Sequence, residues 1–128
     1  MQLCVDTHLP KQFGGTEGES IYIDSEGSFS PERCHDMAKA LVDHVKHSAK
    51  RSKNDARKVV PADFNTDSIL DSIHVFRVFD ETCQSATILS LPKFLNELKE
   101  KGKMVKLIVI DSIAFHYRVC LILLFCSR

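Results

Sequence analysis

The segment "VKLIVIDS", residues 105–112, is a nearly continuous apolar run that ends in an aspartate and a serine. Strands of this composition are typical of parallel sheets, because helices cover both faces of such a sheet and bury every side chain. The segment therefore predicts a strand in a parallel sheet that is flanked by helices.

Two further segments predict strands on either side of a helical stretch. "SIYIDS", residues 20–25, is also an apolar run that ends in an acid, and the glycines at positions 14, 15 and 18 suit turns before it. "IHVFRVF", residues 73–79, alternates polar with apolar residues and is rich in β-branched and aromatic side chains. Both patterns are typical of strands.

The first long helix is predicted over "SPERCHDMAKALVDHVKHSAK", residues 30–50. Ser30 suits the N-cap and Pro31 suits the first helical position. We expect the helix to fray in the basic segment, residues 46–58. An apolar stripe at helical spacing would face the core; it consists of Cys34, Met37, Ala38, Leu41 and Val45.

A second helical region is predicted from about Glu81 to Lys101, and Gly102 suits its end. Pro92 is expected to break or kink it, because proline lacks a backbone N–H and clashes with the preceding turn. The apolar stripe consists of Ile88, Leu91, Leu95 and Leu98. A short helix is predicted to begin at Thr66.

Strands that alternate with helices predict an α/β fold built from βαβ units. The chain has 128 residues, of which 44% are hydrophobic and 27% charged, which suits one small domain. Lys plus Arg equals Asp plus Glu at 17 each, so no overall charge favours nucleic acid or a membrane surface. The apolar stretch at residues 119–126 is far shorter than the ~20 residues that cross a bilayer, so we expect no membrane association.

Acids follow two of the predicted strands: Asp24 and Glu26 after the first, and Asp111 after the last. Ligands of open α/β sheets bind just beyond the carboxyl ends of the strands. Acids there can hold Mg²⁺, directly or through water, or can activate a water molecule. The alternative is an acid that caps the following turn or helix, and the residues alone leave both open.

The basic segment contains six Lys or Arg residues, opposed only by Asp55. It could contact a phosphate backbone. A solvated helix end and loop is favoured, because no aromatic residue for base stacking is interleaved. His44 and His47 could share a metal on one helix face, but no second pair completes a zinc-type spacing.

Residues 1–118 resemble the ATPase core of the RecA/RadA-type recombinases, and most closely a eukaryotic paralogue lettered C, which acts in homologous recombination repair. The resemblance implies a partial RecA-like core, a mostly parallel sheet with flanking helices. It lies in five segments that occur in the family's order: "MQLCVD", "FGGTEGESIYIDSEGSFSPER", "FNTDSILDSIHVFRVFDE", "LSLPKFL" and "KLIVIDSIAFHYR".

The resemblance implies roles for four residues, and ATP and Mg²⁺ as ligands. Glu26 matches the glutamate that polarises the water attacking the γ-phosphate, a step that depends on a positioned nucleophile. Asp111 matches the Walker B aspartate, which holds Mg²⁺ through water, and Ser112 follows it as in the family. Arg33 matches an arginine that packs on the adenine base, with a solvated helix residue as the alternative.

Two departures from the family limit these expectations. The phosphate loop GxxxxGK[ST] (Walker A) does not occur in the sequence. We therefore expect residues 1–118 to be a partial core that contains Walker B alone, to bind ATP poorly and not to hydrolyse it unaided. Residues 119–128, "VCLILLFCSR", differ from the family's polar segment and DNA-contacting loops and are expected to form a divergent apolar tail.

The sequence thus favours part of a DNA repair protein of homologous recombination. In the intact family member, other recombinase paralogues and single-stranded DNA would be its partners, in the nucleus. The alternatives are a non-catalytic interaction module that binds other paralogues, or a truncated inactive product. The first hypothesis predicts that the carboxyl groups of Glu26 and Asp111 face one crevice, within roughly 10 Å of each other, as one Mg²⁺ with its waters requires.

Overall fold

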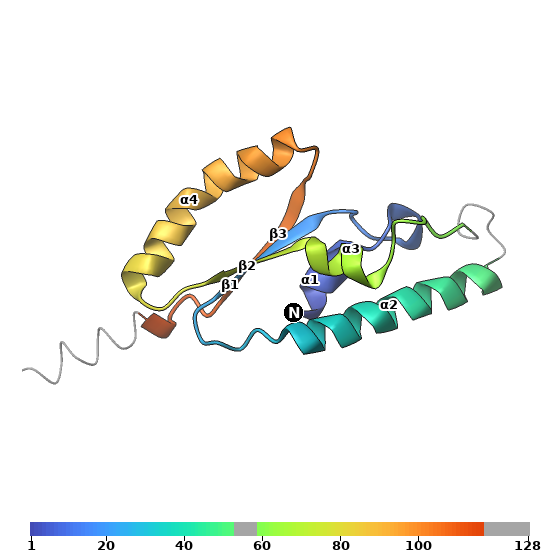
Figure 1. The fold of residues 1–128 in the computed structure, drawn as a ribbon, viewed down its shortest axis with the longest axis horizontal. Coiled ribbons are helices and arrows are strands. Elements are labelled where there is room, and N and C mark those ends of the chain that lie inside the picture. The colour runs from blue at the N-terminus through green and yellow to red at the C-terminus, as the bar shows by residue number, and fades with distance from the viewer. Residues whose placement is uncertain (53–58, 117–128) are drawn as a thin grey trace, which may run out of the picture.

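The computed structural model describes residues 1–52 and 59–116 and shows strands alternating with helices (Figure 1). This arrangement confirms the predicted α/β class. In chain order the elements are α1 (Gln2–Thr7), the 3₁₀ helix η1 (Lys11–Phe13), β1 (Glu19–Asp24), α2 (Pro31–Arg51), α3 (Thr66–Asp71), β2 (Ile73–Arg77), α4 (Glu81–Glu100) and β3 (Val105–Asp111).

The described strands form one sheet in the order β2-β1-β3, and both pairings are parallel. At the carboxyl edge the register aligns Asp24 of β1 with Arg77 of β2 and with Asp111 of β3. The chain passes from β1 to β2 on one side and then crosses back to β3 on the other side of β1. The strand order therefore reverses between β1 and β3, the switch point at which open α/β sheets bind their ligands.

Helices lie on the two faces of the sheet, with α4 on one side and α1, α2 and α3 on the other (Figure 1). The right-handed crossover rule accounts for this, because the two crossovers run in opposite directions across the sheet. Each face has its own apolar core. The buried residues on the α4 side are Ile21, Ile23, Val78 and Leu91, and those on the other side are Val5, Ala38, Val42, Val45, Phe64 and Ile69.

The helices begin and end at residues with the expected capping chemistry. The Ser30 hydroxyl accepts a 3.2 Å hydrogen bond from the Arg33 N–H at the start of α2, and Pro31 occupies the first turn. Asp80 caps α4 in the same way. Gly102, with φ of +75°, follows α4 in the left-handed conformation that glycine adopts without strain. These features confirm the helix positions predicted from the sequence.

The expected fraying of α2 before Arg51 and the expected break of α4 at Pro92 are wrong, and a kink at Pro92 stays a prediction. Helix α2 remains regular through residues 46–51, because Ala49 is still buried in this segment. Helix α4 is continuous through Pro92. Proline removes one helical hydrogen bond, and the burial of Leu91 and Leu98 on either side offsets that loss. The predicted fraying at residues 53–58 and the apolar tail at 119–128 fall outside the described residues.

Strand β3 is less buried than its composition predicted. All residues of β1 are buried, whereas β3 is partly exposed and Ile108 keeps 41% of its surface accessible. The reason is topological, since β1 has a neighbour on both sides and β3 lies at an edge of the described sheet. In the part of the chain that the structure describes, no helix combines the length and apolar character needed to span a membrane.

Candidate functional site

The turn after β1 is organised by a single buried carboxylate, that of Asp24, which is 3% exposed. Its Oδ1 atom accepts hydrogen bonds from three successive backbone N–H groups and its Oδ2 atom from a fourth. The donors are Glu26 (3.2 Å), Gly27 (2.8 Å), Ser28 (3.1 Å) and Phe29 (3.3 Å). Asp24 therefore caps the turn, which is the alternative that the sequence left open for a strand-end acid.

An arginine on the neighbouring strand completes the environment of Asp24. Arg77 Nη1 lies 2.9 Å from Asp24 Oδ2. Burial by itself would raise the pKa of Asp24, but the N–H groups of Phe29, Gly27 and Ser28 and the Arg77 guanidinium outweigh it and hold the pKa below its usual value. These contacts engage both carboxylate oxygens, so Asp24 shapes the site and is not free to bind a metal.

Asp111, the last residue of β3, is held by two hydroxyl groups from β1 and its turn. Tyr22 donates to Asp111 Oδ2 over 2.5 Å, and Ser28 donates to the same oxygen over 3.2 Å. Asp111 is half-buried, and its Oδ1 has no hydrogen-bond partner within the described ranges. One carboxylate oxygen is thus anchored while the other is available to a ligand.

Tyr22 is suited to this anchoring role by its surroundings. The side chain is 2% exposed, and the Phe29 ring packs against it with 5.1 Å between ring centroids. Burial, followed by the hydrogen bond to Asp111, raises the pKa of Tyr22 to about 12. The phenol therefore stays protonated at neutral pH and remains a donor to Asp111.

A serine fastens the tips of the two strands directly. The Ser25 hydroxyl donates to the Ser112 carbonyl over 2.8 Å and accepts from the Ser112 N–H over 2.6 Å. The Ser25 N–H also donates to the Asp111 carbonyl over 2.8 Å. The chain segments that leave β1 and β3 are therefore held side by side at the carboxyl edge.

Glu26 lies on the turn that this network fixes, two positions beyond the end of β1. Its side chain is exposed and has no partner in the described part of the chain. Glu26 and Asp111 thus follow neighbouring parallel strands at one edge of the sheet, at the switch point. A distance of roughly 10 Å between their carboxyl groups stays a prediction.

The other two predicted site residues are Ser112 and Arg33. Ser112 contributes backbone groups to the contact with Ser25. Arg33 lies in the first turn of α2, and its exposed guanidinium has no partner among the residues the structure describes. No contact brings Arg33 into the cluster around Asp111, so its adenine-stacking role stays a prediction.

Tyr22, Ser25 and Ser28 are site residues that the sequence alone does not reveal. The turn itself had a signal, because an Asp followed by a Gly three residues later is typical of a turn capped by its own side chain. The bond from Tyr22 to Asp111 had none, since the two residues are 89 positions apart.

No group of three His, Cys, Asp or Glu side chains is arranged to hold a metal ion among residues 1–52 and 59–116. The histidine pair on α2 gains no support from the structure, and His44 Nε2 instead lies 3.4 Å from the Ser48 hydroxyl. A cation at the carboxyl edge would therefore need water or ligand oxygens beside Asp111.

Comparison with known proteins gives matches along most of the chain. The Rad51 family profile matches residues 1–51. "DNA repair protein RAD51 homolog 3" of Dictyostelium discoideum is 38% identical over 117 residues, covering 91% of this chain and 29% of that protein. The Cricetulus griseus protein of the same name is 36% identical over 118 residues, covering 92% and 31%. "DNA repair and recombination protein RadA" of Halobacterium salinarum is 31% identical over 120 residues, covering 91% and 35%.

The chain belongs to the RecA/RadA-type recombinase family. This confirms the resemblance drawn from the sequence segments. The region that matches the Rad51 profile contains β1, the turn with Glu26 and all of α2. The chain spans about a third of the length of these recombinase relatives.

Proposed function

We propose that this chain contributes the carboxylate-bearing edge of a RecA-like ATPase core to a DNA repair protein of homologous recombination. The observation that carries the proposal is the hydrogen bond from Tyr22 to Asp111, which fixes the end of β3 against β1 at the switch point. The names of the relatives, which refer to DNA repair and recombination, support the process.

The residues at this edge fit a water-mediated magnesium site of an ATPase. Asp111 would hold the cation's water through Oδ1, with Ser112 beside it. When bound, Mg²⁺ would neutralise negative charge on the phosphates. Glu26 is exposed on a fixed turn and would orient the attacking water, and Arg33 would stack on the adenine base.

The phosphate cradle is the part that these residues do not supply, because no GxxxxGK[ST] motif occurs among them. We propose that residues 1–118 are a partial core, that residues 119–128 are a separate apolar tail, and that the chain does not hydrolyse ATP unaided. Single-stranded DNA, other recombinase paralogues and the nucleus are the partners and location proposed for the intact protein.

A second candidate function is a non-catalytic interaction module that binds other recombinase paralogues. Strand β3 lies at an edge of the described sheet, and apolar side chains around it are exposed: Met104 by 54%, Ile108 by 41% and Ile113 by 60%. Such an edge favours a covering partner. A truncated inactive product is the third possibility and predicts proteolytic lability and aggregation.

A nucleotide titration tests the first proposal. The chain is titrated with a fluorescent ATP analogue, with and without Mg²⁺, beside Asp111→Asn and Glu26→Gln variants. We expect weak Mg²⁺-dependent binding that Asp111→Asn removes and Glu26→Gln preserves, because Glu26 would act on water. Absence of Mg²⁺-dependent binding up to about 10 mM, equivalent to roughly −3 kcal/mol, would contradict the proposal. Co-purification with a paralogue would then favour the interaction module.

A further inference from the structure

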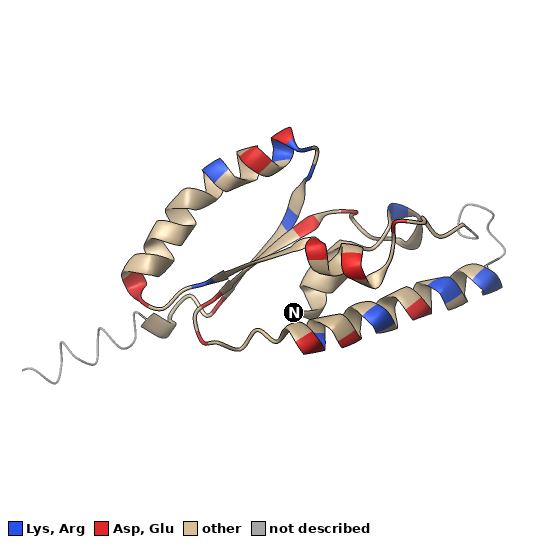
Figure 2. Cartoon of the chain, in the orientation of Figure 1, with Lys and Arg blue, Asp and Glu red and all other residues tan. Residues whose placement is uncertain are grey.

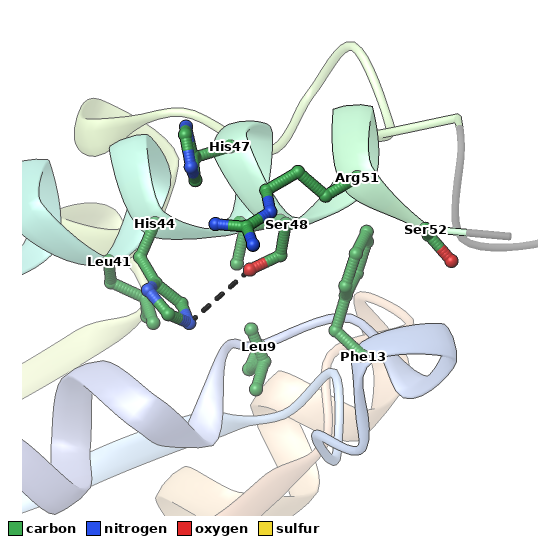
Figure 3. Close-up of a pocket in the computed structure, with 9 residues that line it drawn as sticks. Leu9, Phe13, Leu41, His44, His47, Ser48, Arg51 and Ser52 are labelled. Atoms are coloured by element: carbon green, nitrogen blue, oxygen red, sulfur yellow. Dashed lines mark hydrogen bonds between the residues drawn. The ribbon is translucent and has the colours of Figure 1, made fainter.

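A cavity of about 510 Å³ lies away from the carboxyl edge, between the C-terminal half of α2 and the segment that follows α1 (Figure 3). Its volume is within the range of ligand-binding pockets. The lining consists of the apolar residues Leu9, Phe13, Leu41 and Val45 and the polar residues His44, His47, Ser48, Arg51 and Ser52.

The cavity is a groove with two chemically different walls. His44, His47, Ser48 and Arg51 recur at helical spacing, so they share one face of α2 over about 10 Å. Figure 3 shows Leu9 and Phe13 on the opposite side of the space from these polar side chains. A ligand in the groove would thus meet donors beside Leu41 and Val45 on the α2 wall, and the apolar side chains of Leu9 and Phe13 on the other wall.

The charge in the lining of the groove is of one sign, positive. None of its described lining residues is acidic. Arg51 and Lys50 lie in the last turn of α2, where basic residues gather (Figure 2). The side chains of His47 and Arg51 have no hydrogen-bond or ion-pair partner in the described part of the chain. Arg51 is therefore a permanently charged cation that is available to a carboxylate. Its guanidinium can donate two hydrogen bonds to such a group.

We propose that this groove binds an acidic peptide segment that carries one large apolar side chain. The apolar side chain packs on Leu9 and Phe13, and the flanking carboxylates are bound by Arg51 with the imidazoles beside it. Charge complementarity selects an anionic occupant, and the apolar wall requires one that also buries hydrocarbon.

The lining favours a peptide over nucleic acid. Arg51 is the one permanently charged residue of the described lining, whereas a nucleic acid site requires several cations to match successive phosphates. Three of the four apolar residues in the lining are aliphatic, and Phe13 alone could stack on a base. An acidic peptide needs one strong cation and aliphatic surface, and the groove provides both.

The test uses the full chain and a fluorescein-labelled peptide of sequence Asp-Glu-Phe-Glu-Asp, followed by fluorescence anisotropy. Arg51→Glu is expected to weaken binding about tenfold, as loss of a charge-assisted contact predicts. Lys50→Glu is the matched control, because it makes the same charge change on an exposed neighbour outside the lining; its expected effect is below about threefold. Replacing the peptide's phenylalanine with serine should also abolish binding. Circular dichroism checks that both variants fold.

Three outcomes would overturn the proposal: no binding of the peptide by the wild-type chain, equal losses in the Arg51→Glu and Lys50→Glu variants, or binding that survives the phenylalanine-to-serine change. A single-stranded oligothymidine probe covers the competing class of ligand. If it binds more tightly than the peptide and loses affinity with Arg51→Glu, the groove is a nucleic acid site. The groove does not involve Glu26 or Asp111. Failure of the peptide-binding proposal is therefore independent of the result of the nucleotide titration.

Discussion

The buried Tyr22 hydroxyl donates a 2.5 Å hydrogen bond to Asp111 Oδ2, across the boundary between β1 and β3. The bond joins two residues that are 89 positions apart in the chain, at the point where the strand order reverses. It fixes one oxygen of Asp111 and leaves the other directed to no protein group in the described part of the structure. Asp111 is therefore a carboxylate that is anchored through one oxygen and open to a ligand through the other.

Tyr22→Phe removes this donor while keeping the aromatic ring that packs on Phe29. We expect the free energy of unfolding to fall by about 1–2 kcal/mol, because a hydrogen bond to a charged group is lost. Urea unfolding followed by circular dichroism measures the change. In a double-mutant cycle with Asp111→Asn the two effects should be non-additive, and simple additivity would show that the bond contributes no coupling energy.

Gly27→Ala should destabilise the chain for two reasons. Gly27 has φ of +78°, and an added Cβ would lie 2.5 Å from Arg77 Nη2. Gly102→Ala is the matched control, because Gly102 has φ of +75° and nothing within 4 Å of the added atom. An alanine in the left-handed conformation costs about 1–2 kcal/mol at either position. A larger loss of unfolding free energy for Gly27→Ala therefore measures the displacement of Arg77 from Asp24. Equal losses would show that Arg77 moves without cost.

Ser25→Ala should loosen the junction between the ends of β1 and β3. It leaves the Ser112 N–H and carbonyl without the hydroxyl that satisfies both, so we expect a loss of about 1–3 kcal/mol in unfolding free energy. Ser90→Ala serves as the control, because the Ser90 hydroxyl donates to the Thr87 carbonyl on the exposed surface of α4. Unfolding free energies that fall equally in the two variants would refute a special role for Ser25.

Stability should fall at acidic pH through Asp24 and Glu19. The pKa of Asp24 is lowered in the folded chain, as is that of Glu19, where burial opposes but the hydrogen bonds from His74 and Lys103 prevail. A lowered folded pKa gives stability that is present above the unfolded value, about 4 for a carboxyl group. That stability is lost as the pH falls through the folded pKa. Urea unfolding from pH 6 down to about pH 2 should show this loss, and Asp24→Asn should flatten it. An unchanged slope in that variant would contradict the assignment.

Much of the fold was predictable from local patterns. The apolar runs before Asp24 and Asp111 indicated strands of a parallel sheet, and Ser30 with Pro31 indicated the start of α2; the structure contains all of these. Such features depend on neighbouring residues, so the sequence expresses them directly. The break predicted at Pro92 is absent, because tertiary packing of Leu91 and Leu98 maintains α4 as one helix.

The site was predictable only in part, because some of its contacts join residues that are far apart in the sequence. Glu26 and Asp111 were placed at one edge of the sheet by the rule for parallel strands, and the register agrees. The Asp24–Gly27 spacing is a local sign that Asp24 caps a turn, but no local pattern shows that Asp111 keeps an oxygen free. That distinction depends on Arg77, Tyr22 and Ser28, which reach the two carboxylates through the fold.

We propose that Asp111 and Glu26 border one Mg²⁺–nucleotide site at the β1/β3 switch point. Amide NMR spectra of the chain with ATP, recorded while Mn²⁺ replaces Mg²⁺, test it most directly, since the paramagnetic ion broadens signals of nearby residues. We expect the signals of residues 25–28 and 111–113 to broaden together, and we expect Asp111→Asn to prevent both effects. Broadening confined to one of these segments, or equal broadening in the Asp111→Asn variant, would contradict it.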